Sequence, residues 1–215
     1  MNYYGASNWK DEYYRNSSLY SLDFSLRGGS DRANFGFLGG HTKNTTTADN
    51  NYFNRYNALL NINMLPFQWF TVSAFLNATR TDRNRNTSLR SRYGEIGYLP
   101  DLSTPLSPNV EQYRNYMSLH DRSVNDNITN SIQGNISISL DILSNLNYTT
   151  AFAVDYSEGI RDIFYPSELM ETTNYISNYY GYSQRYTFTN NLKYNLTIDD
   201  KNALSFVGGI QYLDD

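Results

Sequence analysis

The sequence predicts an all-β fold, a transmembrane antiparallel up-and-down β-barrel segment of about eight strands with long outer loops. Three observations predict it. Apolar and polar residues alternate with a period of two along most of the chain, as in strands with two different faces. The alternating stretches are about ten residues long, which matches the ~9–11 residues that a tilted strand needs to cross a bilayer. The connections between them are alternately short and long, as in outer-membrane barrels.

The composition agrees with a segment of a transmembrane β-barrel and excludes other classes of protein. The 215 residues include 21 Tyr, and charged residues make up 18%, below the roughly 25% of an ordinary soluble domain. The mean hydropathy of −0.61 and the lack of a run of ~20 apolar residues exclude a helical membrane protein. A barrel stays polar on average because only alternate residues face lipid. The net charge of −4 argues against a nucleic-acid binder, which presents a basic face.

The first four predicted strands each place a set of apolar residues on one face, opposite polar and charged residues. These sets are Tyr20, Leu22, Phe24 and Leu26; Ala33, Phe35, Phe37 and Gly39; Tyr56, Ala58, Leu60, Ile62 and Met64; and Phe70, Val72, Ala74, Leu76 and Ala78. A Gly-Gly-Ser-Asp sequence at 28–31 predicts a tight turn, and residues 65–68 predict another. A polar loop is expected at 42–51, between the second and third strands.

The last four predicted strands repeat the pattern. Their apolar sets are Ile132, Gly134, Ile136, Ile138 and Leu140; Leu146, Tyr148, Phe152, Val154 and Tyr156; Tyr182, Tyr186, Phe188, Leu192 and Tyr194; and Leu204, Phe206, Gly208, Ile210 and Tyr212. Short links are predicted at 141–144 and 199–202, and a longer loop at 157–179. By analogy with outer-membrane barrels, we expect the short links on the periplasmic side and the long loops outside the cell.

Two segments lie outside the alternating pattern. Residues 1–18 are interpreted as a lead-in segment, and the partial barrel is expected to occupy 19–215. Its long outer loop, about 81–127, shows no alternation. Within it, Ser107-Pro108 resembles a helix N-cap followed by proline at the first helical position. Because Val110, Tyr113 and Met117 recur at helical spacing, we predict a short helix at about 108–119.

The distribution of charge distinguishes the two faces. The apolar sets contain no Lys, Arg, Asp or Glu, and a cation at the bilayer midplane would cost ~2–4 kcal/mol. Charges within the strands fall on the opposite face, as with Asp23, Arg55, Asp155 and Arg185. Gln184 is expected near the outer rim, whereas the pattern does not account for Asn190. Trp69 suits an aromatic girdle at the membrane interface.

Two alternatives to part of a large barrel remain open from these patterns. A soluble, carbohydrate-binding β-sandwich alternates in the same way, and about eight strands can close into a small barrel with an adhesin or structural role. Strand length, loop asymmetry and the abundance of Tyr together favour the membrane barrel over the sandwich. The first residues lack the basic and apolar regions of a signal peptide, so we expect a fragment or a non-native start.

The sequence contains no catalytic, cofactor-binding or metal-binding motif. There is no Cys, and the two His residues, His41 and His120, lie far apart. G-x-S-x-G, P-loop and H-E-x-x-H patterns are all missing. The acidic pairs at 11–12 and 199–200 are interpreted as solvated loop and turn charges. We therefore expect a protein that is not an enzyme.

Tyrosines in the long outer loop are the remaining candidates for ligand contact. They are Tyr93, Tyr98, Tyr113 and Tyr116. Such residues stack on sugar rings or anchor a partner protein at interfaces. The favoured interpretation is that they pack the loop against itself, so no individual ligand-binding residue is predicted.

Several segments, in this order, carry a family resemblance. They are N-W-K-D-E at 8–12, Gly-Gly-Ser-Asp at 28–31, the aromatic and glycine strand 35–40, Phe-Asn-Arg-Tyr at 53–56 before N-A-L-L-N-I-N, Trp69, V-D-Y at 154–156, Tyr-Pro at 165–166, and the hairpin formed by 183–192 and 202–209. Their order and spacing, over most of the chain, resemble the barrel domain of SusC/RagA-type TonB-linked outer-membrane proteins of Bacteroidetes.

The resemblance implies a TonB-dependent receptor for nutrient uptake in the bacterial outer membrane. Members of this family have a barrel of about 22 strands around an N-terminal plug. They import glycans or peptides, take energy from TonB, and work with a SusD-type surface lipoprotein that covers the barrel. This sequence shows neither plug nor TonB box, so the resemblance implies a segment of roughly a third of the wall. It implies contact with outer-membrane lipid, and no cofactor.

Overall fold

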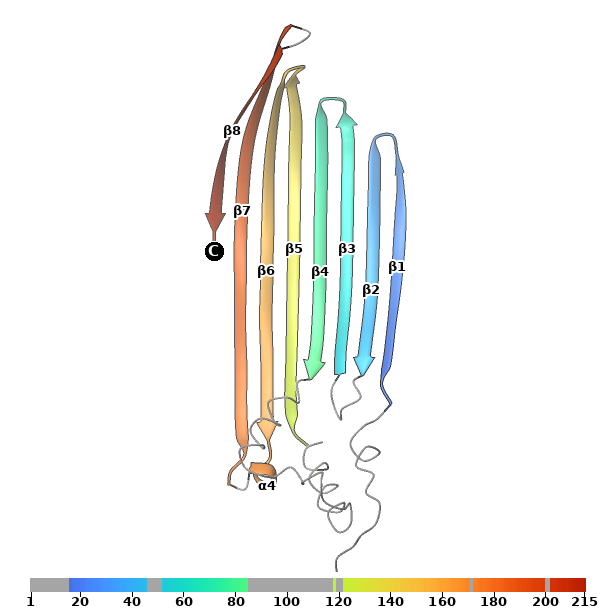
Figure 1. The fold of residues 1–215 in the computed structure, drawn as a ribbon, viewed down its shortest axis with the longest axis vertical. Coiled ribbons are helices and arrows are strands. Elements are labelled where there is room, and N and C mark those ends of the chain that lie inside the picture. Colours follow the sequence, from blue (N-terminus) through green and yellow to red (C-terminus); the bar gives the residue numbers. More distant parts are fainter. Residues whose placement is uncertain (1–15, 46–51, 85–117, 119–121, 171, 200–201) are drawn as a thin grey trace, which may run out of the picture.

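The computed structural model describes residues 16–45, 52–84, 118, 122–170, 172–199 and 202–215. These residues form one antiparallel sheet of eight long strands, which stand side by side in sequence order (Figure 1). The strands are β1 (Ser18–Ser30), β2 (Ala33–Thr45), β3 (Tyr52–Phe67), β4 (Phe70–Asn84), β5 (Val124–Leu143), β6 (Leu146–Tyr165), β7 (Tyr175–Asp199) and β8 (Asn202–Asp214). A four-residue helix, α4 (Ser167–Met170), follows β6. No helix of the described residues is long and apolar enough to cross a membrane.

The sheet has the predicted up-and-down topology and is open. Each strand pairs with the next one in the chain, from β1–β2 to β7–β8. Among the described residues, β1 and β8 do not pair with each other, and no second sheet covers either face. The all-β antiparallel fold is therefore confirmed. The described residues form neither the two packed sheets of a β-sandwich nor a small closed barrel.

The strands are longer than the predicted ten residues. They range from 13 residues in β1 to 25 in β7. The prediction of a loop at 157–179 is wrong, because β6 continues to Tyr165 and β7 begins at Tyr175. Likewise, β4 extends to Asn84 and β5 begins at Val124, which shortens the loop expected at 81–127. The alternation fades in these extensions because polar residues occupy both faces, whereas the backbone ladder continues regardless of side chain.

The hairpin turns lie at one end of the sheet, and the strand ends that lead into the longer connections lie at the other (Figure 1). The turns occupy Asp31-Arg32, Gln68-Trp69 and Ser144-Asn145, so each falls slightly later than the sequence predicted. Trp69 belongs to a turn and does not open β4. Pro66, predicted as part of that turn, lies in β3 where the register with β4 shifts, because proline has no N–H for the ladder.

Few residues are buried in this single layer. Ile163 and Tyr165, at the loop end of β6, are 9% and 3% exposed. Large apolar side chains elsewhere on the strands are exposed, for example Phe24 at 60% and Ile210 at 75%. A sheet with an apolar face normally buries it against a second layer. The predicted helix at about 108–119, apart from Ser118, and the loop tyrosines lie outside the described residues.

Candidate functional site: an apolar face and a polar face

The apolar sets predicted on separate strands meet in continuous rows. One row crosses all eight strands, where neighbouring residues are paired in register: Gly28, Phe35, Ile62, Ala74, Ile136, Phe152, Phe188 and Tyr212. We call this side of the sheet the apolar face. We consider the rows of this face from the one that contains Tyr148 to the one that contains Tyr156. Among the described residues, these rows contain no charged residue except Asp214, at the free edge of β8. The prediction that strand charges avoid this face is confirmed for the predicted sets.

The height of the apolar face matches a lipid bilayer. On β6 it runs from Tyr148 to Tyr156, about 27 Å along the strand at ~3.4 Å per residue. With a strand tilt of ~35–45°, this corresponds to about 20 Å along the membrane normal, close to the ~25 Å apolar band of outer-membrane barrels. β5, β6 and β7 extend beyond this face on the loop side.

Aromatic clusters lie at both ends of the apolar face. At the turn end, Trp69 stacks on Phe67 with ring centroids 5.5 Å apart and also contacts Phe70. At the loop end, His41 stacks on Tyr56 at 4.4 Å and meets Tyr20 edge-on at 5.4 Å. Aromatic girdles of this kind mark the two interfaces of a barrel with the membrane. His41 therefore belongs to an aromatic cluster.

A tyrosine accounts for Asn190, the polar residue that sequence reasoning left unexplained. Asn190 lies on the apolar face opposite Thr150, and the Tyr148 hydroxyl donates a hydrogen bond to its Oδ1 at 2.5 Å. A buried or lipid-facing amide without a partner would cost ~1–3 kcal/mol. The hydrogen bond removes part of that cost. Sequence alone could not find it, because Tyr148 and Asn190 belong to different strands.

A carboxylate with three hydrogen-bond donors marks the loop-side end of the apolar face. Glu158 Oε1 accepts a hydrogen bond from Asn130 Nδ2 at 2.7 Å. Its Oε2 accepts from the hydroxyls of Tyr156 at 2.9 Å and Tyr180 at 3.2 Å. Gln184 pairs with Tyr156 in the adjacent row, in agreement with its predicted place near the outer rim. The cluster places the first charges directly beyond the aromatic boundary.

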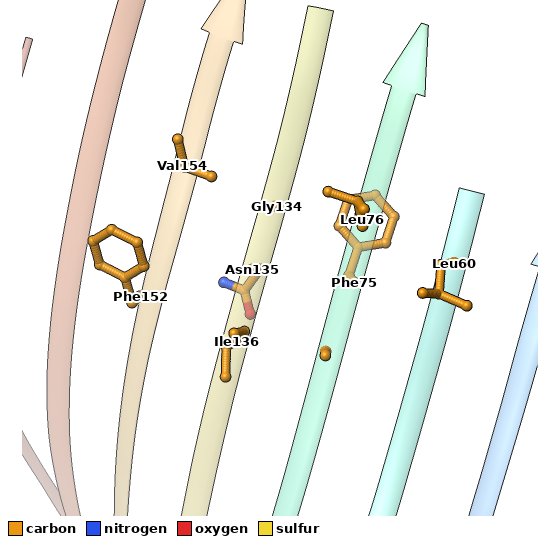
Figure 2. Close-up of a pocket in the computed structure, with 9 residues that line it drawn as sticks. Leu60, Phe75, Leu76, Gly134, Asn135, Ile136, Phe152 and Val154 are labelled. Carbon is orange, nitrogen blue, oxygen red and sulfur yellow. The ribbon is translucent and has the colours of Figure 1, made fainter. Parts of the chain in front are cut away.

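A shallow groove hollows the middle of the apolar face. It has a volume of about 290 Å³. Figure 2 shows apolar side chains around Gly134, which contributes none of its own; they include Leu60, Leu76, Phe152 and Val154. A Cβ at position 134 would lie 3.2 Å from Val154 Cγ1. Apart from Asn135, whose side chain belongs to the opposite side of the sheet, the lining residues are apolar or glycine, so a lipid acyl chain suits the groove.

The opposite side of the sheet, the polar face, carries most of the strand charges at the level of the apolar rows. Asp155 and Arg185, which the sequence pattern placed on this face, pair in register, and Arg185 Nε lies 2.5 Å from Asp215 Oδ1. Side-chain amides and hydroxyls bond across strands, for example Asn77 Nδ2 to Gln133 Oε1 at 3.4 Å. Asp23 and Arg55 also occupy this face. The polar face is therefore suited to contact water.

The connection between β6 and β7 is held by polar contacts at α4. Arg122 Nη1 lies 3.3 Å from Glu168 Oε1, and the Ser167 N–H donates to Asn174 Oδ1 at 2.7 Å. A backbone N–H, the Ser167 hydroxyl and Arg122 together lower the pKa of the Glu168 carboxyl. Within the described part of the chain, no three His, Asp or Glu side chains are placed to hold a metal ion.

Known proteins resemble this chain in structure, whereas the sequence comparisons found no match. No protein-family model matches the sequence, and a search of curated proteins found no significant match. Solved chains of the RagAB peptide importer in its closed-closed and open-open states, and of the RagAB peptide transporter, each superpose with a TM-score of 0.74. The identities are 15%, 16% and 15%, respectively. Each match covers 99% of this chain and 26% of the importer chain, so this chain spans about a quarter of their length. At this identity the likeness establishes the shared fold.

Proposed function

We propose that this chain forms part of the wall of an outer-membrane β-barrel in a TonB-dependent importer. The observation that carries the proposal is the apolar face, which continues across all eight strands at bilayer height. Among the described residues no second layer covers it, so it needs an apolar surrounding. The hydrocarbon core of a membrane supplies that surrounding, and a sheet that enters it must be closed by further strands.

The polar face is proposed to line a water-filled lumen through which a nutrient passes. The fold shared with the RagAB peptide importer supports a role in import, and it favours peptides over glycans as the substrate. The partners we propose are outer-membrane lipid, TonB, a SusD-type surface lipoprotein and the imported peptide or glycan. Nucleic acid is not among them, because the chain carries a net charge of −4. We propose transport without chemical conversion of the substrate.

Localisation and uptake test this function. Expression of the intact protein should place it in the outer-membrane fraction, with heat-modifiable mobility on gels. Deletion of its gene should reduce uptake of labelled oligopeptides, and re-expression should restore it. A SusD-type lipoprotein should co-purify with the tagged protein in mild detergent. Recovery in the soluble fraction, or uptake unchanged by the deletion, would contradict the proposal.

The flanking gene sequence gives an independent test. We expect a plug domain and a TonB box upstream of these residues, and further barrel strands in the same reading frame. A complete short gene with its own signal peptide would contradict this proposal.

A further inference from the structure

Two arginines flank an asparagine in one row on the polar face, near the loop end of the sheet. Arg83, Asn127, Arg161 and Tyr179 are paired in register across β4, β5, β6 and β7. Strands two positions apart in a sheet are separated by about 10 Å, so this is the spacing between the backbones at Arg83 and Arg161. Both guanidinium groups can therefore reach a single small anion placed between them.

The row surrounds an open depression. A cavity of about 410 Å³ is lined by these four residues together with others that include Thr129 and Gly159. A Cβ added at Gly159 would meet no atom within 4 Å, so the floor is open there. At the neighbouring Gly181, the Tyr179 hydroxyl oxygen lies 2.5 Å from the ideal Cβ position. The Tyr179 side chain thus lies against the backbone and forms one wall.

The positive charge of this row has no counter-charge among the described residues. Neither Arg83 nor Arg161 makes a side-chain hydrogen bond or salt bridge there, and Arg161 Nε is buried without a partner. On this face of β4 to β7, the nearest described carboxylate along the strands is Asp155. It lies six residues from Arg161, about 20 Å away, and opposite Arg185. Glu158 and Asp162 point to the other face because side chains alternate along β6.

We propose that this arginine pair binds a carboxylate of an acidic oligopeptide as it enters the barrel. The inference rests on the proposed function and names the substrate class of that lumen. Arginine binds carboxylates in bidentate geometry, which lysine cannot reproduce. Asn127 Nδ2 already donates to Asn125 O and Oδ1, at 3.2 and 3.3 Å. Because Asn127 stands between the two arginines in this row, its own Oδ1 can accept a hydrogen bond from the N–H of the same amino-acid unit.

Binding to the intact protein, purified in detergent, tests this inference. The probes are a blocked alanine octapeptide with two glutamates, the same peptide with two glutamines, and trigalacturonate. We expect the glutamate peptide to bind more tightly than the glutamine peptide. Arg83→Gln and Arg161→Gln should each weaken glutamate-peptide binding about tenfold, equivalent to about 1.4 kcal/mol, because each removes a charge-assisted hydrogen bond.

Matched variants separate the site from general charge effects. Arg27→Gln removes the same charge from the polar face at the turn end, outside the cavity, and should leave binding unchanged. Arg83→Lys and Arg161→Lys keep the charge but lose the planar fork, so they should restore only part of the affinity. Gly159→Phe should fold, because its Cβ meets open space, and should block the cavity. Heat-modifiable mobility checks that each variant folds.

The outcomes distinguish the site from the function on which it rests. Equal binding of the two peptides, unaffected by the arginine variants, would overturn the site and leave the importer function intact. Binding of trigalacturonate alone would overturn the peptide assignment. Absence of binding and of uptake for every probe would overturn both the site and the proposed function.

Discussion

An arginine placed at the centre of the apolar face tests whether that face contacts lipid. Ile136 is 54% exposed and lies in the row that crosses all eight strands. It is four residues from Leu140 at the turn side and four from Ile132 at the loop side, about 13 Å from either boundary. A cation at that depth costs ~2–4 kcal/mol in an outer-membrane barrel. Ile136→Arg should therefore lower the free energy of unfolding by about that amount.

Asn135→Arg is the matched control, since it adds the same side chain on the same strand at nearly the same depth. Its side chain lies on the polar face, so we expect a change within about 0.5 kcal/mol. Asn130→Arg, in the row of Glu158 directly beyond the loop-side boundary, should cost only about 0–1 kcal/mol. The measurement is equilibrium unfolding of the intact protein in phospholipid vesicles, followed by tryptophan fluorescence and gel mobility. Equal costs for Ile136→Arg and Asn135→Arg would refute the assignment of the two faces.

Three further predictions concern individual contacts and the sheet edges. Tyr148→Phe should destabilise the protein by about 1–3 kcal/mol in the same unfolding assay, because Asn190 loses its hydrogen bond; adding Asn190→Leu should recover most of that loss, and no recovery would contradict this account. Gly208→Ala should be neutral or stabilising by about 0.5–1 kcal/mol, since its Cβ meets open space. Gly209→Ala should cost about 1–3 kcal/mol, because its Cβ would collide with Asn191 Oδ1 and the Asn190 carbonyl; equal stabilities of the two variants would argue against this backbone placement. The 215-residue segment expressed alone should aggregate or form oligomers in detergent through the free edges of β1 and β8, and a stable monomer by light scattering would contradict that.

The alternation of apolar and polar residues along each strand was sufficient to assign the residues to the two faces of the sheet. Alternation is a property of the extended backbone, in which successive side chains point to opposite sides. The sets that contain Leu60, Ile136 and Phe152 could therefore be assigned before any pairing was known, and the structure aligns them in adjacent rows. The same reasoning placed Asp155 and Arg185 on the polar face.

The ends of the strands could not be predicted in this way. β6 and β7 continue past Tyr156 and Tyr182 towards the loop side, where polar and aromatic residues occupy both faces. No hydrophobic period remains there to indicate a strand. The continued hydrogen-bond ladder between neighbouring backbones keeps these residues extended, and that ladder depends on the partner strand.

The alternation of residue types is enough to show that this chain forms two-faced strands connected as hairpins, and to assign the strand residues to their faces. Which residues of different strands stand side by side becomes known only from the folded sheet. The contact of Tyr148 with Asn190 and the row of Arg83 and Arg161 both depend on it. The physical reason is that the side-chain period is local to each strand. The register that joins residues 42 to 78 positions apart is set by hydrogen bonds between strands.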